Sequence, residues 1–100
     1  MYKFGVIIAY DCKLNKVRSN IVKICKDYGL SRIEYSVFIG ALGSTEYNNI
    51  LDEFKTMGFK TPFIIFVQRI SIEDIKSFDI IKYQSEKLRK YHTNNNSNVI

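Results

Sequence analysis

The first strand that the sequence predicts constrains the fold most, because it is apolar on both of its faces. Residues 2–10 are dominated by Val, Ile, Phe and Tyr, which are enriched in strands. Successive side chains of a strand point to opposite faces, so Val6 and Ile8 would share one face and Ile7 and Ala9 the other. An antiparallel sheet with one wet face should alternate more cleanly. We therefore predict that helices cover one face and that a second copy of the chain, in a symmetric dimer, covers the other.

The spacing of apolar residues then changes along the chain. Over residues 14–28 they recur at three- and four-residue steps, which predicts a helix that ends at Gly29. Residues 30–42 read by propensity as one long strand. A second helix is predicted to begin at Ser44, which would cap it, and to end at Gly58.

The last part of the chain is predicted to form shorter elements. Residues 62–70 read as a strand, residues 71–78 as a single helical turn, and residues 79–83 as a final short strand. Residues 84–100 are polar and are predicted to form a flexible tail. The order β, α, β, α, β, β is that of one α+β domain over residues 1–83, and a length of 100 residues also suits a single domain.

Charge and composition narrow the range of functions. Residues 1–32 hold seven basic and two acidic side chains, and residues 82–100 hold four and one, so the excess of positive charge lies at the two ends of the chain. A basic surface favours an anionic partner, nucleic acid first, and ordinary solvated helix charge is the alternative. The apolar runs, such as residues 62–67, are too short to cross a bilayer, and the first residues lack the features of a signal peptide. We expect no membrane association and a cytoplasmic location.

Few side chains can carry chemistry. The one histidine, His92, lies in the tail, and Cys12 and Cys25 form no CxxC pair, which argues against Ser–His–Asp catalysis, Cys–His catalysis and a zinc site. Asp11, at the end of the first strand, is the best-placed acid. It either caps the helix that follows or, duplicated in a dimer, binds Mg²⁺ or Mn²⁺ together with its copy.

Four further residues are candidates for contact with a substrate. Arg18 and Arg32 suit phosphate, because the planar guanidinium donates two hydrogen bonds at once, or they are ordinary surface arginines. Tyr10 and Phe38 are either core residues or surfaces on which a base stacks. Position in the sequence leaves both pairs of alternatives open.

Two motifs together resemble the family of the CRISPR-associated protein Cas2. The first strand closes in Tyr10–Asp11, and residues 28–42 read YGLSRIEYSVFIGAL, close to that family's Gly-Leu-x-Arg-x-Gln-x-Ser-Val-Phe-x-Gly pattern. The resemblance covers about residues 1–83. It implies a ferredoxin-like βαββαβ fold, in which an antiparallel sheet carries two helices on one face. It also implies a hairpin with its tip at Tyr35–Ser36, and a homodimer that exchanges the strand at 79–83.

The same resemblance implies a function. Members of the family are described as metal-dependent nucleases acting on RNA or double-stranded DNA, and as bridges between Cas1 integrase dimers during spacer acquisition. Transferred to this sequence, Asp11 is the catalytic and metal-binding residue, with Mg²⁺ or Mn²⁺ as the cofactor. The residues expected to support it or to bind substrate are Tyr10, Arg18, Arg32, Ser36 and Phe38.

Two departures from the family pattern bear on this expectation. Many members carry further acids in the loop after the strand-end Asp, where this chain has Leu14 and Asn15, and Glu34 stands at the usual Gln position. Fewer loop carboxylates weaken the case for cleavage more than the case for binding nucleic acid. The alternatives are a non-catalytic DNA-bridging scaffold for the Cas1 integrase, a VapD-like toxin ribonuclease of the same fold, and a ferredoxin-like small-ligand module.

Overall fold

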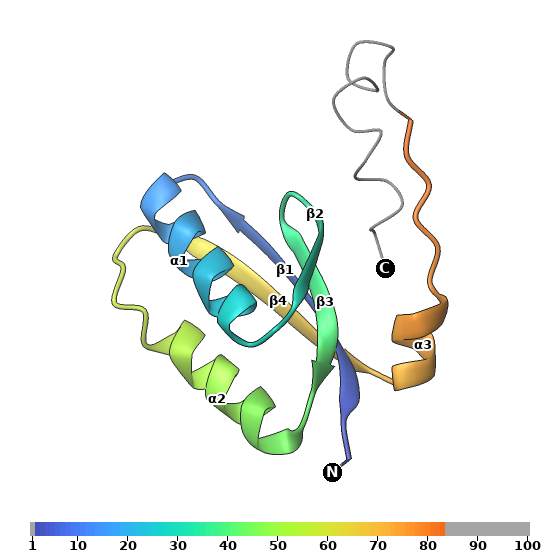
Figure 1. Cartoon of the computed structure of the whole chain (residues 1–100). Helices are drawn as coiled ribbons and strands as arrows, with labels where there is room; N and C mark the ends of the chain where they lie inside the picture. Colours follow the sequence, from blue (N-terminus) through green and yellow to red (C-terminus); the bar gives the residue numbers. More distant parts are fainter. Residues whose placement is uncertain (1, 84–100) are drawn as a thin grey trace.

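The computed structural model describes residues 2–83 and has the predicted α+β architecture (Figure 1). Four antiparallel strands form one sheet in the order β2-β3-β1-β4, which with the element order is the ferredoxin-like fold. The elements are β1 (Phe4–Cys12), α1 (Asn15–Asp27), β2 (Ser31–Glu34), β3 (Val37–Leu42), α2 (Ser44–Lys55), β4 (Phe63–Ile70) and α3 (Ile72–Ser77).

The core lies between the sheet and the two longer helices, which cover the same face (Figure 1). In β1 and β3, Ile8 is paired with Phe38, and both side chains are completely buried on this helix-covered face. From α1 the face receives Val17, Ile21 and Cys25, none of which is exposed to solvent. Each large apolar side chain buried in this way contributes about 1.5–3 kcal/mol, so this one layer accounts for most of the hydrophobic stabilisation.

The end of α1 fixes where β2 begins. Gly29 has φ 77° and its N–H donates to the carbonyl of Lys26 at 2.9 Å, while the N–H of Leu30 donates to the carbonyl of Cys25 at 3.1 Å. These two bonds form a Schellman motif, as the predicted helix end at Gly29 requires. Leu30 then packs against β3 so closely that a Cβ at Gly40 would lie 2.6 Å from its Cδ2.

The predicted cap and end of the second helix are wrong. Gly43 occupies the N-cap of α2, and its N–H donates to Oε1 of Glu46 at 2.9 Å, so Ser44 is the first helical residue rather than the cap. The Glu46 carboxylate satisfies this amide, and a cap side chain is not needed for it. The helix ends at Lys55, with Thr56 as C-cap, before it reaches Gly58.

Residues 30–42 form the hairpin β2–β3, with a turn at Tyr35–Ser36, so the single strand expected from propensity is wrong and the hairpin implied by the resemblance is confirmed. The helical turn after β4 is also confirmed: α3 begins after Ser71, whose Oγ accepts from the N–H of Asp74 at 3.0 Å. Residues 79–83 form no strand within the single chain, and their exchange into a partner stays a prediction. The predicted tail, 84–100, lies outside the described residues.

The second face of the sheet, which we call the open face, is covered only in part. Ile75 of α3 lies directly over Gly5 at one end of β1. Further along, the cross-strand neighbours of Ala9 and Asp11 in β4 are Phe66 and Ile64, and their side chains are 62% and 53% exposed. The apolar second face that the sequence predicts is therefore present and still exposed in the single chain.

Candidate functional site

The predicted site residues gather at one end of β1, but on two faces of the sheet. Tyr10 is buried on the helix-covered face, with 6% of its surface exposed. Asp11, the next residue, points to the open face and is exposed, as the alternation of a strand requires. The acid and the predicted supporting residues therefore do not share one cleft in a single chain.

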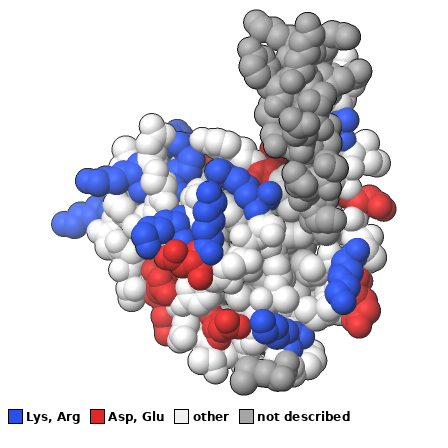
Figure 2. Space-filling view, in the orientation of Figure 1, with Lys and Arg blue, Asp and Glu red and all other residues white. Residues whose placement is uncertain are grey.

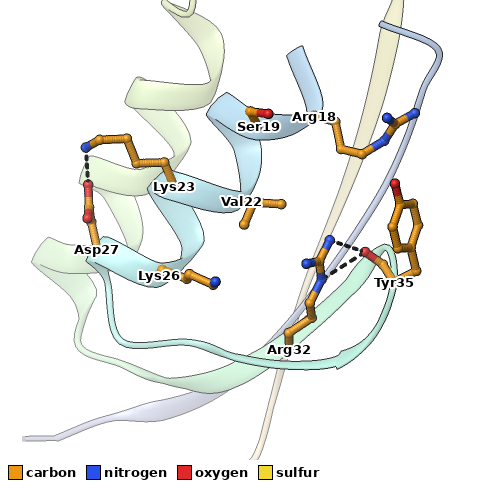
Figure 3. Close-up of a pocket in the computed structure, with 8 residues that line it drawn as sticks. All are labelled: Arg18, Ser19, Val22, Lys23, Lys26, Asp27, Arg32 and Tyr35. Carbon is orange, nitrogen blue, oxygen red and sulfur yellow. Dashed lines mark hydrogen bonds and ion pairs between the residues drawn. The ribbon is translucent and has the colours of Figure 1, made fainter. Parts of the chain in front are cut away.

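Arg32 holds the tip of the β2–β3 hairpin. Its Nε and Nη2 donate to the carbonyl of Tyr35 at 3.1 and 2.7 Å, and Nη2 also donates to the Tyr10 hydroxyl at 3.2 Å. The Tyr10 hydroxyl donates to the same Tyr35 carbonyl at 2.9 Å. The three residues thus form a closed network in which a charged group meets neutral acceptors. Figure 3 shows the two bonds from Arg32 to Tyr35.

Arg18 also lies beside the Tyr35 ring. It donates from Nη2 to the carbonyl of Cys12 at 3.1 Å and from Nη1 to Oδ1 of Asn15. The guanidinium carbons of Arg18 and Arg32 lie 5.6 and 5.1 Å from the centre of the Tyr35 ring. The structure therefore brings two of the predicted arginines together around an aromatic residue that the sequence did not single out.

The other two predicted residues act through packing and backbone. Phe38 is completely buried, and the guanidinium carbon of Arg32 lies 5.6 Å from the centre of the Phe38 ring. Phe38 therefore contributes to the site by packing against Arg32. The carbonyl of Ser36 accepts a bond from the N–H of Tyr10 at 3.1 Å. Of the alternatives left open for Tyr10 and Phe38, the core reading is the correct one.

Between α1 and the hairpin lies a hollow of about 520 Å³, which we call the basic hollow (Figure 3). Figure 2 shows Lys and Arg side chains gathered over the part of the surface that α1 forms. Within residues 2–83, the only carboxylate lining the hollow is that of Asp27, which pairs with Lys23 at 2.8 Å. The lining residues are Arg18, Ser19, Val22, Lys23, Lys26, Asp27, Arg32 and Tyr35.

Three of these residues were not predicted to form a site. Lys23 and Lys26 are three positions apart on α1, and the sequence placed them only on the wet side of that helix. Tyr35 was predicted only as part of the hairpin tip. Its place in the hollow depends on the turn that brings the hairpin against α1. No local sequence pattern predicts this contact.

Asp11 was expected either to cap α1 or to bind a metal. The cap interpretation is wrong, because the N-cap of α1 is Leu14 and no side chain makes the capping bond. In the described part of the chain, no group of three His, Cys, Asp or Glu side chains could hold a metal ion. One chain therefore offers a single exposed carboxylate, an oxygen ligand of the kind Mg²⁺ accepts but too few to form a site alone.

The pKa shifts of two groups near this region, Cys25 and Glu34, have ordinary physical causes. Burial raises the pKa of the Cys25 thiol to about 12, so it stays protonated and is not a nucleophile at neutral pH. The N–H of Tyr35, followed by the ammonium of Lys82, lowers the pKa of Glu34, which keeps that carboxylate charged on the hairpin. Neither shift creates an acid or base poised near neutral pH.

The fold and the hollow together define the class: a small ferredoxin-like α+β protein with a basic, aromatic-walled surface. The sequence pattern of the family described as CRISPR associated protein Cas2 matches residues 4–74. The chain belongs to this family. Within the described residues, no helix is long and apolar enough to cross a membrane.

Comparison with individual proteins agrees with this assignment. A CRISPR-associated endoribonuclease Cas2 of Pyrobaculum aerophilum is 34% identical over 71 residues, which cover 68% of this chain and 78% of that protein. One from Methanospirillum hungatei is 38% identical over 45 residues, and one from Desulforudis audaxviator is 44% identical over 34, but these matches span only 47% and 32% of those proteins. The crystal structure of Streptococcus pyogenes Cas2 superposes with a TM-score of 0.68 at 19% identity, covering 78% of this chain and 99% of that one, and so shows the same fold.

Proposed function

We propose that this chain is a homodimeric, metal-dependent endonuclease of the adaptation stage of CRISPR defence, in which two Asp11 carboxylates act on one phosphodiester. The observation that carries the proposal is the position of Asp11, exposed beside the exposed side chains of Ile64 and Phe66 on the open face. A second copy seated on this apolar surface would remove it from water and bring its own Asp11 to the same interface. The relatives that are named endoribonucleases support the same activity.

Paired Asp11 carboxylates suit Mg²⁺ or Mn²⁺, because such ions are held by one or two carboxylates together with substrate phosphate and water. The ion, when bound, supplies an activated water and neutralises charge on the phosphate. Two arginines of the helix-covered side, Arg18 and Arg32, bind phosphates of the nucleic acid away from the cleaved bond. RNA is the substrate that the names of the relatives favour, with double-stranded DNA as the other candidate.

A metal-titrated cleavage assay on labelled RNA and duplex DNA tests the role of Asp11. Asp11→Ala should lower Mg²⁺-dependent cleavage by about a hundredfold or more, the scale of losing one group that stabilises a transition state. Asp52→Ala removes another exposed acid, on α2, and is the matched control, expected to cleave normally. Cleavage that persists in Asp11→Ala but not in metal-free buffer would rule out this assignment.

The dimer is tested separately by light scattering coupled to size-exclusion chromatography. We expect the native chain to elute as a dimer and Phe66→Lys to elute as a monomer, because a buried ammonium on the open face costs more than the contact gains. Tyr2→Lys, a substitution at a 76% exposed aromatic near the N-terminus, is the control and should leave the dimer intact. A native monomer at every concentration would refute the pairing of Asp11.

A second candidate function is a non-catalytic DNA-bridging scaffold for the Cas1 integrase. This function is favoured because Asp11 is the one exposed acid of its site. Within residues 2–83, no group of three His, Cys, Asp or Glu side chains could hold a metal ion. In that case Asp11→Ala leaves spacer integration intact and the native protein cleaves nothing. Loss of Lys23 and Lys26 from α1 would instead weaken DNA binding and reduce its dependence on salt.

A further inference from the structure

The basic hollow lies on the helix-covered face, and Asp11 points to the open face, so the proposed cleavage does not account for the hollow. Its walls come from α1 and the tip of the β2–β3 hairpin, which Figure 3 shows facing each other across the cavity. Four cationic side chains and one anionic side chain line it. A cavity with this balance of charge attracts an anionic ligand.

The two arginines are held in place without being neutralised. Within residues 2–83, neither Arg18 nor Arg32 forms an ion pair with a carboxylate. Arg18 donates to a carbonyl and an amide oxygen, and Arg32 donates to a carbonyl and a hydroxyl. A guanidinium has five N–H donors, so each keeps donors for a further acceptor. Fixed charges with unused donors are suited to a phosphate, which accepts two parallel bonds from one guanidinium.

Tyr35 adds a surface for an aromatic ligand. Its side chain is 61% exposed, although its backbone is fixed by two bonds from Arg32 to its carbonyl. The ring stands at the rim of the hollow, beside both guanidiniums. Nucleobases stack on such rings, and the cavity volume of about 520 Å³ lies in the range of small-molecule sites.

We propose that the basic hollow is a subsite for one unpaired nucleotide of a single-stranded nucleic acid, with its phosphate on Arg18 and Arg32 and its base on Tyr35. In a duplex the faces of the bases are covered by their neighbours, so the Tyr35 ring can be used only by a strand whose bases are unpaired. The subsite thus gives the protein a preference for single strands over duplexes. This proposal rests on the proposed binding of nucleic acid but does not depend on cleavage.

Fluorescence anisotropy in EDTA, where no metal-dependent cleavage occurs, tests the subsite with a labelled single strand and its duplex. Tyr35→Ala should weaken single-strand binding about tenfold, the usual effect of losing one stacking aromatic, and leave duplex binding within about twofold. Tyr35→Phe keeps the ring and should bind like the native chain. Tyr2→Ala removes another exposed ring, 76% exposed, and should have no effect.

Two further arms identify the ligand. Arg18→Gln should reduce the slope of log affinity against log salt by about 0.7 for the single strand, which is the effect of losing one phosphate contact. A nucleoside monophosphate should compete at least about a hundredfold more weakly than the strand, because it makes only one of the strand's contacts. Equal competition would assign the hollow to free nucleotides and overturn the proposal.

The outcomes also separate this proposal from the proposed function. Binding of single strands that does not change in Tyr35→Ala, or an equal loss for strand and duplex, refutes the subsite alone. Absence of any salt-dependent binding by the native chain refutes both. Loss of cleavage in Asp11→Ala with unchanged binding in EDTA, together with a loss of single-strand binding in Tyr35→Ala, supports both, because the two sites lie on opposite faces of the sheet.

Discussion

A double-mutant cycle on Arg32 and Tyr10 tests whether the hairpin tip is held as the structure shows. Arg32→Met keeps the length of the side chain and removes its three bonds, to the Tyr35 carbonyl and the Tyr10 hydroxyl. Hydrogen bonds from a charged donor contribute about 1.5–3 kcal/mol each where they are sheltered, and much less where water competes. Because Arg32 is exposed, we expect a total loss of about 2 kcal/mol in the free energy of unfolding, or about 8–16 °C in Tm.

Tyr10→Phe removes one acceptor of Arg32 and one donor to Tyr35, and should cost about 1 kcal/mol. The double variant should lose about 0.5 kcal/mol less than the sum of the two single losses, because only the bond between Arg32 and Tyr10 is counted in both. Urea unfolding followed by circular dichroism, at one protein concentration, measures all four chains. Lys55→Met removes an exposed cation from α2 and should change stability by less than about 0.5 kcal/mol.

Losses that add within about 0.3 kcal/mol would refute the network, since two residues that share a bond cannot be independent. Arg32 would then be free of Tyr10 in solution. Its guanidinium would be oriented by ligand alone, and the turn at Tyr35 would need another explanation. A coupling near about 0.5 kcal/mol would instead show that Arg32 bonds to the Tyr10 hydroxyl in solution and helps to hold the hairpin tip.

Two further predictions concern the packing behind the site. Gly40→Ala should lower the free energy of unfolding by about 1–3 kcal/mol in urea titrations, because the new Cβ would lie 2.6 Å from Leu30 Cδ2; an unchanged midpoint would show that Leu30 is not packed this closely against Gly40. The native chain should lose stability as the pH rises from about 9 toward 12, because the unfolded chain releases the Cys25 proton while the folded chain, whose thiol pKa is about 12, retains it. Below pH 9 this contribution is fully present, and Cys25→Ala, measured by thermal unfolding at the same pH values, should show a shallower decline; parallel curves would count against burial of the thiol.

The sequence predicted the elements that the spacing of apolar residues determines, but not the turn that a side-chain hydrogen bond stabilises. Spacing located both long helices, since their apolar faces pack on one layer. Propensity read residues 30–42 as one strand, because Tyr35–Ser36 contains no Gly, Pro, Asn or Asp, and Ser is a weaker turn residue than these. The turn is stabilised by Arg32, which bonds the Tyr35 carbonyl from within β2. Such a contact exists only when the hairpin has formed, so propensity missed the hairpin, which the family resemblance implied.

The candidate site shows the same division. Arg18 and Arg32 could be chosen because of the chemistry of the guanidinium, and Arg18 also because it lies close to Asp11 in the sequence. Tyr35 could not, because an exposed tyrosine in a turn has no pattern that distinguishes it from any other. Its importance arises from α1, which lies opposite the hairpin and completes the hollow. Residue type thus predicted the cations, and tertiary structure was needed for the aromatic residue between them.

The alternation of β1 has a consequence for the order of events on a bound strand. Tyr10 faces the network beneath the basic hollow and Asp11 faces the open side, although the two residues are adjacent. If two copies join through their open faces, both Asp11 residues lie at the interface while both hollows remain outside. A strand held in a hollow must then pass around the end of β1 to reach the acids, so binding and cleavage use separate stretches of the same strand. Substitutions in the hollow should therefore raise KM and leave kcat nearly unchanged, whereas Asp11 substitutions should lower kcat and spare affinity.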